Sequence, residues 1–86
     1  MYRVEYRPEA DKDLERLDKV IRKRIIKKVH WLAKNVEEIR HEMLGGGYKG
    51  LYKLRIGDWR VIYEIRYPQK LLVVYTVGHR KEIYRK

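Results

Sequence analysis

Six side chains in the second half of the chain have the chemical types needed to act on a phosphate. They fall into two short segments and are Lys53, Arg55, Arg60, His79, Arg80 and Tyr84. Arginine presents a planar fork of N–H donors to phosphate oxygens, and lysine or histidine can carry a proton. These segments hold no paired carboxylates and no Cys or Ser beside an ordered base. Acyl transfer and glycoside chemistry are therefore poorly supported.

The reaction that best suits this set is cleavage of RNA by its own 2′-hydroxyl. Such a step needs a proton acceptor, stabilisation of charge at the phosphorus and a proton donor for the leaving oxygen. Lys53 is the candidate acceptor, because neighbouring cations favour the neutral form of a lysine. His79 is a rival acid or base, whereas Arg55 stays protonated and can hardly act as a base. A metal-dependent nuclease would need several carboxylates, and the two within residues 51–66, Asp58 and Glu64, are few for such a site.

Segment 51–66 must position the first three of these side chains, and its pattern is typical of a β-hairpin. Apolar, β-branched and aromatic runs flank Gly57-Asp58, and glycine in first place suits a two-residue type II′ turn. This turn predicts that Arg55 lies opposite Arg60. Strand side chains alternate between faces, so Lys53 joins these arginines on one face. The other face takes the apolar side chains Leu54, Ile56, Trp59, Val61, Tyr63 and Ile65.

Two arginines directly opposite each other cost stability, by about 0.2–1 kcal/mol for a cross-strand pair. A bound anion such as a nucleic-acid phosphate would make the arrangement favourable. The alternative is that the long basic side chains splay into water on an outer sheet face. A further strand over 71–77 predicts a return to the Arg60 end of the hairpin, which would bring His79, Arg80 and Tyr84 to the cations. The alternatives are that His79 is only hydrogen-bonded at the strand end and that Tyr84 anchors the C-terminus in the core.

The first half of the chain predicts one strand and two helices. Residues 2–6 alternate as a short strand, and a proline with acidic residues after it predicts a helix over 8–17. Asp18 can cap a second, long helix over 19–35, whose apolar residues recur at helical spacing. Segment 36–44 could hold one or two more helical turns.

Gly45-Gly46-Gly47 predicts a flexible connection into the hairpin, because the Gly-Lys-Ser/Thr of a phosphate loop does not follow it. The predicted order is therefore β-α-α-β-β-β. This is a small α+β domain over residues 1–86, mainly an antiparallel sheet with a helical pair packed on one face. The cations are expected on the open face.

The long helix carries basic side chains opposite its apolar stripe, Arg22, Lys23, Lys27 and Lys34. This face could contact nucleic acid, although such a charge run is more often only solvated. Trp31 is expected to pack in the core or between helices rather than to stack on a base. His30 and His41 lie far apart without a carboxylate–histidine spacing, so no metal site is predicted.

Composition narrows the class of partner. The net charge is +10, and residues 48–86 contribute 10 basic and only 3 acidic side chains to it. A domain this basic is expected to bind a polyanion or a strongly acidic protein. A membrane surface is less expected, because no segment combines a basic face with a large exposed apolar one. No cysteine, signal peptide or bilayer-length apolar run is present, so a cytoplasmic location is expected.

The segments YKLRIGDWRVIYEI and VGHRKEIY resemble the RelE/ParE superfamily of toxin–antitoxin toxins, specifically its RelE branch. The similarity runs over nearly the whole chain, including length, basicity and element order. The resemblance implies a ribosome-dependent, metal-independent mRNA interferase that cuts message in the ribosomal A site and inhibits translation. It also implies contact with ribosomal RNA, an acidic RelB-like antitoxin as partner, and no cofactor.

The resemblance also implies a role for each candidate side chain. Lys53 stands where the family has a lysine tied to catalysis, and Arg55 occupies a second basic position that is often lysine. Arg60 matches the arginine placed on the scissile phosphate. Arg80 matches the arginine near the leaving group, and Tyr84 the tyrosine that orients or stacks on the substrate base.

Two other functions fit the same resemblance. ParE-type relatives share the fold and poison DNA gyrase without cutting RNA, although the full basic set at positions 53, 55, 60 and 80 argues against that branch. The second is an inactive toxin that is kept as an antitoxin-binding partner.

Overall fold

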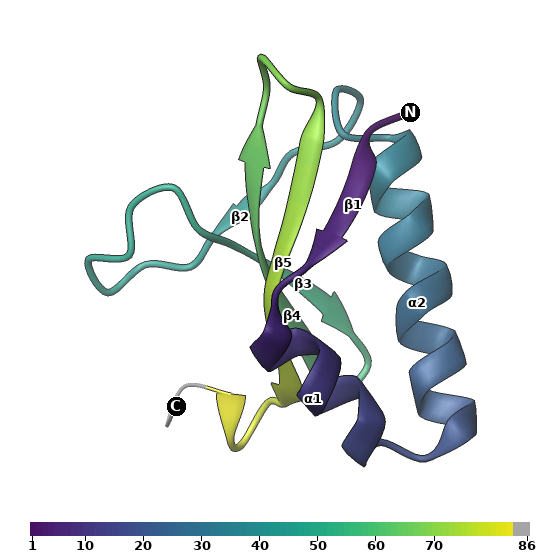
Figure 1. Ribbon diagram of the computed structural model, residues 1–86. Helices are drawn as coiled ribbons and strands as arrows, with labels where there is room; N and C mark the ends of the chain where they lie inside the picture. The colour runs from purple at the N-terminus through teal and green to yellow at the C-terminus, as the bar shows by residue number, and fades with distance from the viewer. Residues whose placement is uncertain (84–86) are drawn as a thin grey trace.

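The computed structural model describes residues 1–83 as an open five-stranded sheet with two helices (Figure 1). In chain order the elements are β1 (Arg3–Tyr6), α1 (Pro8–Arg16), α2 (Lys19–Lys34), β2 (Glu42–Met43), β3 (Tyr52–Ile56), β4 (Trp59–Arg66) and β5 (Leu71–His79). The strand order is β1-β5-β4-β3-β2. Only β1 and β5 run parallel; the other neighbours are antiparallel. The predicted α+β fold with a mainly antiparallel sheet is confirmed.

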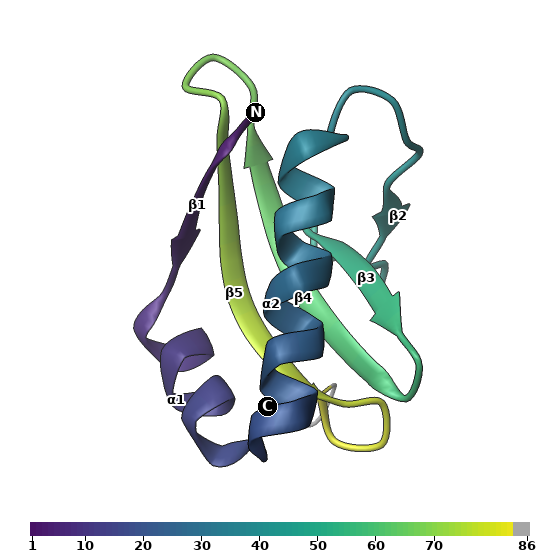
Figure 2. The same ribbon diagram turned by 90° about the vertical axis from the view of Figure 1, so that its right-hand side faces the viewer.

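Both helices lie on the same side of the sheet, and α2 runs roughly along the direction of β4 and β5 (Figure 2). Asp18 caps α2, because its side chain accepts hydrogen bonds from the backbone N–H groups of Val20 and Ile21 at 2.9 and 3.1 Å. The apolar stripe of α2 packs against the apolar face of the hairpin; the buried residues include Ile25, Val29, Leu32, Val61 and Tyr63. The helices therefore cover the face that the sequence predicted. Neither helix within residues 1–83 is long and apolar enough to cross a bilayer.

The hairpin has the register that the turn residues predict. Arg55 pairs with Arg60, and Ile56 pairs with Trp59. Gly57 has a φ of 59°, which a type II′ turn requires at its first central position and which glycine adopts without strain. The cations of β3 and β4 consequently project from the face that the helices leave open.

Segment 36–44 does not extend α2, contrary to prediction. Asn35 ends the helix, since its side-chain amide donates to the Trp31 carbonyl at 2.8 Å. Further along, the His41 ring donates from Nε2 to the Val36 carbonyl at 2.7 Å, and its Nδ1 lies 2.6 Å from the buried Tyr63 hydroxyl. Burial raises the pKa of Tyr63, so its hydroxyl stays protonated and can donate to His41. This network ties the segment to β4 and directs the chain into β2.

The triple-glycine segment connects two strands that pair with each other. β2 lies antiparallel to β3, with Glu42 opposite Lys53, and the Leu44 N–H donates to the Leu51 carbonyl at 3.0 Å across the loop. The loop therefore closes a second hairpin, and it positions a carboxylate beside the cations.

The prediction for segment 71–77 is confirmed, whereas the prediction for Trp31 is not. The apolar segment that follows the second turn is a central strand, as predicted, and Leu71 to Val74 are all buried. Trp31, by contrast, is 40% exposed on α2, so the prediction that it packs in the core or between helices is wrong. The core side of α2 is filled by its aliphatic residues, and Trp31 lies beside that stripe.

Asp13 links α1 to the middle of the sheet. β1 ends at Tyr6, opposite Val74, so the Val77 N–H lies beyond the reach of β1; the buried Asp13 carboxylate accepts from it at 2.9 Å. Replacing Asp13 with alanine should destabilise the protein by about 1–3 kcal/mol, the cost of a buried donor that loses its acceptor. Each kcal/mol lowers Tm by roughly 4–8 °C in a domain of this size. Thermal unfolding followed by circular dichroism measures the change.

Asp13→Asn is the matched control, because the amide oxygen can still accept from the Val77 N–H. We expect this variant to keep most of the stability. Equal losses in both variants would contradict the assigned hydrogen bond.

Candidate functional site

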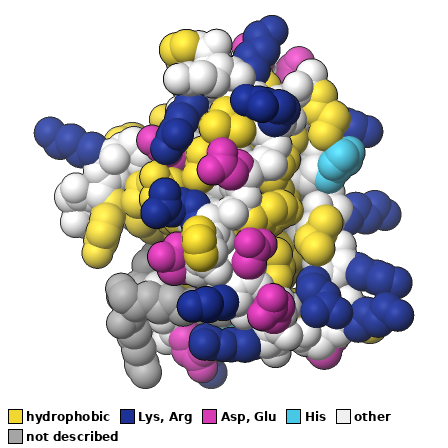
Figure 3. Space-filling view, in the orientation of Figure 1, with side chains coloured by type: hydrophobic (Ala, Val, Ile, Leu, Met, Phe, Trp, Pro, Cys, Tyr) yellow, Lys and Arg dark blue, Asp and Glu magenta, His cyan; other side chains and the backbone are white. Residues whose placement is uncertain are grey.

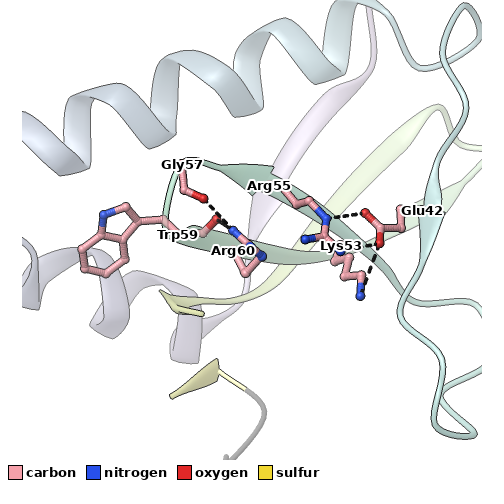
Figure 4. Close-up of polar contacts among 6 residues, drawn as sticks. All are labelled: Glu42, Lys53, Arg55, Gly57, Trp59 and Arg60. Carbon is pink, nitrogen blue, oxygen red and sulfur yellow. Dashed lines mark hydrogen bonds and ion pairs between the residues drawn. The ribbon is translucent and has the colours of Figure 1, made fainter. Parts of the chain in front are cut away.

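The open face brings the predicted cations into adjoining rows. Arg55 on β3, Arg60 on β4 and Gly78 on β5 occupy one row of register partners across three strands. Lys53 lies one row away on the same face, opposite Glu42. The two guanidinium groups turn away from each other, Arg55 toward β2 and Arg60 toward the hairpin turn (Figure 4). This divergence relieves the repulsion that the register alone predicts.

Arg60 is a buried cation held by neutral groups. Its side chain is folded over the turn, where Nη1 donates to the carbonyl oxygens of Gly57 and Trp59, each at 2.8 Å. The residue is only 7% exposed, and within residues 1–83 no carboxylate lies within 4.0 Å of it. A guanidinium carries five N–H donors, so Nε and Nη2 still have donors to offer an anion. Burial of a cation without a counter-ion is costly, and a bound anion would offset that cost.

Glu42 belongs to the site although the prediction from sequence does not include it. It accepts two parallel hydrogen bonds from Arg55, Nε to Oε1 and Nη2 to Oε2, each at 2.8 Å. Lys53 Nζ lies 3.3 Å from Oε2. Hydrogen bonding from Arg55 lowers the pKa of Glu42 to about 2; partial burial acts against this shift, and Lys53 adds to it. The expectation of a purely cationic neighbourhood for Lys53 is therefore wrong. Glu42 and Lys53 lie symmetrically about the glycine loop, and a hairpin reading of that loop could have found the pair.

The Glu42 cluster should make folding stability depend on acid pH. A carboxylate whose pKa is lower in the folded protein than in the unfolded chain stabilises the fold above its ordinary pKa. For Glu42 that contribution is complete above about pH 4.5 and is lost as the pH falls toward 2. We therefore expect wild type to have a higher urea midpoint than Glu42→Gln at pH 7, with a gap that closes across this window.

Glu15→Gln is the control for this titration, because the exposed Glu15 on α1 forms no ion pair with another residue of 1–83. It should follow wild type at every pH. A gap between wild type and Glu42→Gln that stays constant down to pH 2 would contradict the assignment.

The end of β5 lies against the hairpin turn, as the predicted return strand requires. The Arg80 N–H donates to the Asp58 carbonyl at 2.8 Å, and the Arg80 guanidinium lies 3.6 Å from the Asp58 carboxylate. The His79 ring meets Trp59 edge to face, with centroids 5.4 Å apart. His79 and Arg80 are thus adjacent to the turn that holds Arg60. Tyr84 lies outside the described residues.

His79 has a backbone partner. Its Nδ1 accepts the Lys81 N–H at 3.2 Å, so in the neutral ring the proton is on Nε2. In that form the ring offers the site a donor, and the lone pair that a base would use is engaged. This geometry favours the alternative considered from the sequence, a histidine hydrogen-bonded at the strand end. No three His, Cys, Asp or Glu side chains of residues 1–83 are grouped so that they could hold a metal ion.

Comparison with known proteins identifies the family. The family model described as the ParE toxin of the type II toxin–antitoxin system parDE matches residues 4–84. No curated protein sequence matches the chain significantly.

Several solved structures share the fold. A chain of the RelBE2 toxin–antitoxin complex from Mycobacterium tuberculosis is 24% identical and has a TM-score of 0.82, with 92% of this chain and 98% of that one covered. The isolated RelE toxin of E. coli is 20% identical, with a TM-score of 0.78 and 99% and 93% covered. The archaeal RelE–RelB complex from Pyrococcus horikoshii OT3 has a chain that is 28% identical, with a TM-score of 0.71 and 92% and 94% covered. The chain therefore belongs to the ParE toxin family of type II toxin–antitoxin systems, within the RelE/ParE superfamily.

Proposed function

We propose that this toxin is a metal-independent endoribonuclease that cuts messenger RNA in the ribosomal A site. The observation that carries the proposal is Arg60, a buried cation that two backbone carbonyls of the hairpin turn hold and that has no carboxylate partner among residues 1–83. Arg55, Lys53 and Arg80 surround it from both sides. A phosphate is one of the anions whose oxygens match such a forked, partly desolvated donor set.

The reaction is an internal transfer in the RNA. The 2′-oxygen forms a bond to the adjacent phosphorus, the bond from phosphorus to the 5′-oxygen breaks, and a 2′,3′-cyclic phosphate and a 5′-hydroxyl result. The 2′-hydroxyl proton passes to a base, and the leaving 5′-oxygen receives a proton. Arg60 is assigned to the scissile phosphate and Arg80 to the side of the leaving group, where each stabilises charge that grows in the transition state.

Lys53 is assigned as the proton acceptor by elimination, because the Glu42 carboxylate beside it removes the argument from neighbouring cations. Arg55 and Arg60 remain protonated and cannot accept, and the Nδ1 lone pair of His79 is engaged by a backbone N–H. Glu42 is a weak base because its pKa is lowered to about 2. Its role is to orient Lys53 and Arg55 from β2. Tyr84 is assigned to orientation of the substrate base.

We infer that an acidic, RelB-like antitoxin is the protein partner. The net charge of +10 favours an acidic partner, because complementary charge speeds association and disfavours other partners. The similar structures from Mycobacterium tuberculosis and Pyrococcus horikoshii are themselves toxin–antitoxin complexes.

A second candidate function is inhibition of DNA gyrase without catalysis. The observation in its favour is the ParE family model, which spans residues 4–84. In that case the buried Arg60 and the Glu42 cluster would be structural, and messages would stay intact.

One experiment separates these functions. The toxin is induced in cells, a reporter message is mapped by primer extension, and plasmid supercoiling is read from the same culture. We expect cuts at defined positions inside translated codons with normal supercoiling. Intact messages with disturbed supercoiling would overturn the nuclease proposal in favour of the gyrase function. No change in either readout would leave an inactive toxin whose remaining role is to bind its antitoxin.

A further inference from the structure

A second basic site lies on the other side of the hairpin turn. A groove of about 470 Å³ runs between α2 and the end of β3. Four cations, an exposed indole and the turn glycine line it: Arg24, Lys27, Lys28, Arg55, Trp31 and Gly57. Ile56 also lines the groove, and no carboxylate is among the lining residues. Because the Arg55 guanidinium is bound to Glu42, the positive charge of the groove comes from Arg24, Lys27 and Lys28.

The helix that forms one wall has an unusual charge pattern. α2 carries seven Lys or Arg residues and no Asp or Glu. Arg24 and Lys28 are four residues apart, and Arg24 and Lys27 three, spacings at which like charges destabilise a helix. None of these three forms an ion pair with a carboxylate of residues 1–83. In Figure 3, Lys and Arg side chains follow the right-hand edge of the molecule, where α2 lies in Figure 1. Helix stability does not explain this clustering of like charges. Binding of a polyanion would explain it, because the bound anion would offset their repulsion.

Trp31 gives the groove a flat apolar surface. It is 40% exposed, and the Lys28 ammonium lies 3.9 Å from the ring centroid. This cation–π contact orients the indole and places a charge beside it. An exposed aromatic ring among cations is the arrangement with which proteins bind single-stranded nucleic acid, stacking a base on the ring and pairing phosphates with the cations.

Gly57 connects this groove to the site on the open face. Its carbonyl accepts from Arg60 Nη1 at 2.8 Å. On its other side, a Cβ at Gly57 would lie only 3.1 Å from Arg24 Nη2. The backbone of one glycine thus separates the guanidinium of the groove from the buried guanidinium of the candidate active site. Arg24 and Arg60 therefore lie on either side of the same turn residue.

We propose that this groove binds a single-stranded segment of RNA next to the phosphate held by Arg60, with one base stacked on Trp31 and phosphates on Arg24 and Lys27. The inference rests on the proposed function for the identity of the strand. Its binding test does not require cleavage. An acidic peptide could satisfy the cations, but the exposed ring and the path to a buried cation favour alternating bases and phosphates.

The test uses a short fluorescein-labelled oligoribonucleotide with 2′-O-methyl groups, which the toxin cannot cut. Its binding to the full-length protein is measured by anisotropy over a range of salt concentrations. Trp31→Ala should weaken binding roughly tenfold, the loss of one stacked base. Trp31→Phe should restore much of it. Lys27→Ala should reduce the slope of log K against log salt by about 0.7, the value for one phosphate of a single strand. Lys34→Ala, on the same helix outside the groove, removes the same charge and should change binding by less than about twofold.

A direct readout comes from the two tryptophans of the chain. In the Trp59→Phe background, Trp31 is the sole tryptophan, and its emission should be quenched when the oligonucleotide binds. Thermal unfolding confirms that each variant is folded.

The outcomes separate the groove from the nuclease activity. If wild type cuts message but Trp31→Ala binds the oligonucleotide as wild type does, the groove proposal is overturned and the function stands. If wild type does not cut message but the Trp31 and Lys27 effects appear, the function fails and the groove stands. If Trp31→Ala and Lys27→Ala bind the oligonucleotide as wild type does but no longer bind an acidic protein partner, the groove proposal is overturned. The groove is then a protein-docking site.

Discussion

Replacing Arg60 with alanine should reduce message cleavage about 100- to 1,000-fold. That range is typical when one preorganised donor to the developing charge of a transition state is removed. Arg60 is already buried and fixed to the turn by two carbonyls, so its donors need little reorganisation when the phosphate arrives. The rate is measured by primer extension with purified toxin and ribosomes that hold a defined message in the A site.

Two control variants test whether the loss of cleavage is specific to the Arg60 guanidinium. Arg66→Ala removes an arginine from the open face of the same strand, at its far end, and should leave the rate within about twofold of wild type. Arg60→Lys keeps the charge but loses the planar fork, and should recover only part of the activity. The site assignment would fail if Arg60→Ala cleaved at the wild-type rate while circular dichroism showed an intact fold.

Replacing Lys53 with alanine should lower cleavage about 100- to 10,000-fold, the usual contribution of a positioned proton-transfer group. Lys53→Arg tests what the lysine does. Arginine keeps the positive charge beside Glu42 but does not release its proton. If Lys53 accepts the 2′-hydroxyl proton, arginine should be as inactive as alanine.

Lys49→Ala is the matched control for Lys53, since it removes an exposed lysine from the adjacent glycine loop. It should cleave normally. Near wild-type cleavage by Lys53→Arg would rule out proton transfer and assign Lys53 to charge stabilisation alone. Unchanged cleavage by Lys53→Ala would remove it from the site.

The hairpin could be predicted from sequence because the residues that determine its register are close together in the chain. A strand has a side-chain period of two, and a two-residue turn fixes which residues face each other. Those two rules are sufficient to place Arg55 opposite Arg60, and the structure agrees. The same local rules identified Asp18 as a helix cap, since its side chain needs only the next few backbone N–H groups.

What the sequence did not show depends on contacts between distant segments. Glu42 reaches Lys53 through a two-residue strand that is too short to have a periodicity of its own. The burial of Arg60 is invisible in a pattern of charges, because its partners are backbone carbonyls. Trp31 was assigned to the core on apolarity alone, whereas its position beside the aliphatic stripe of α2 exposes it.

The parallel pairing of β1 with β5 has a consequence for how the toxin is made. Arg3 pairs with Leu71, so the first strand of the chain finds its partner only when the last strand has been synthesised. Such long-range pairing forms slowly, because the closure of a long loop precedes any gain from the contacts. The edge strand β1 therefore stays unpaired until residues 71–74 have been synthesised, and the five-stranded sheet is complete only in a nearly finished chain.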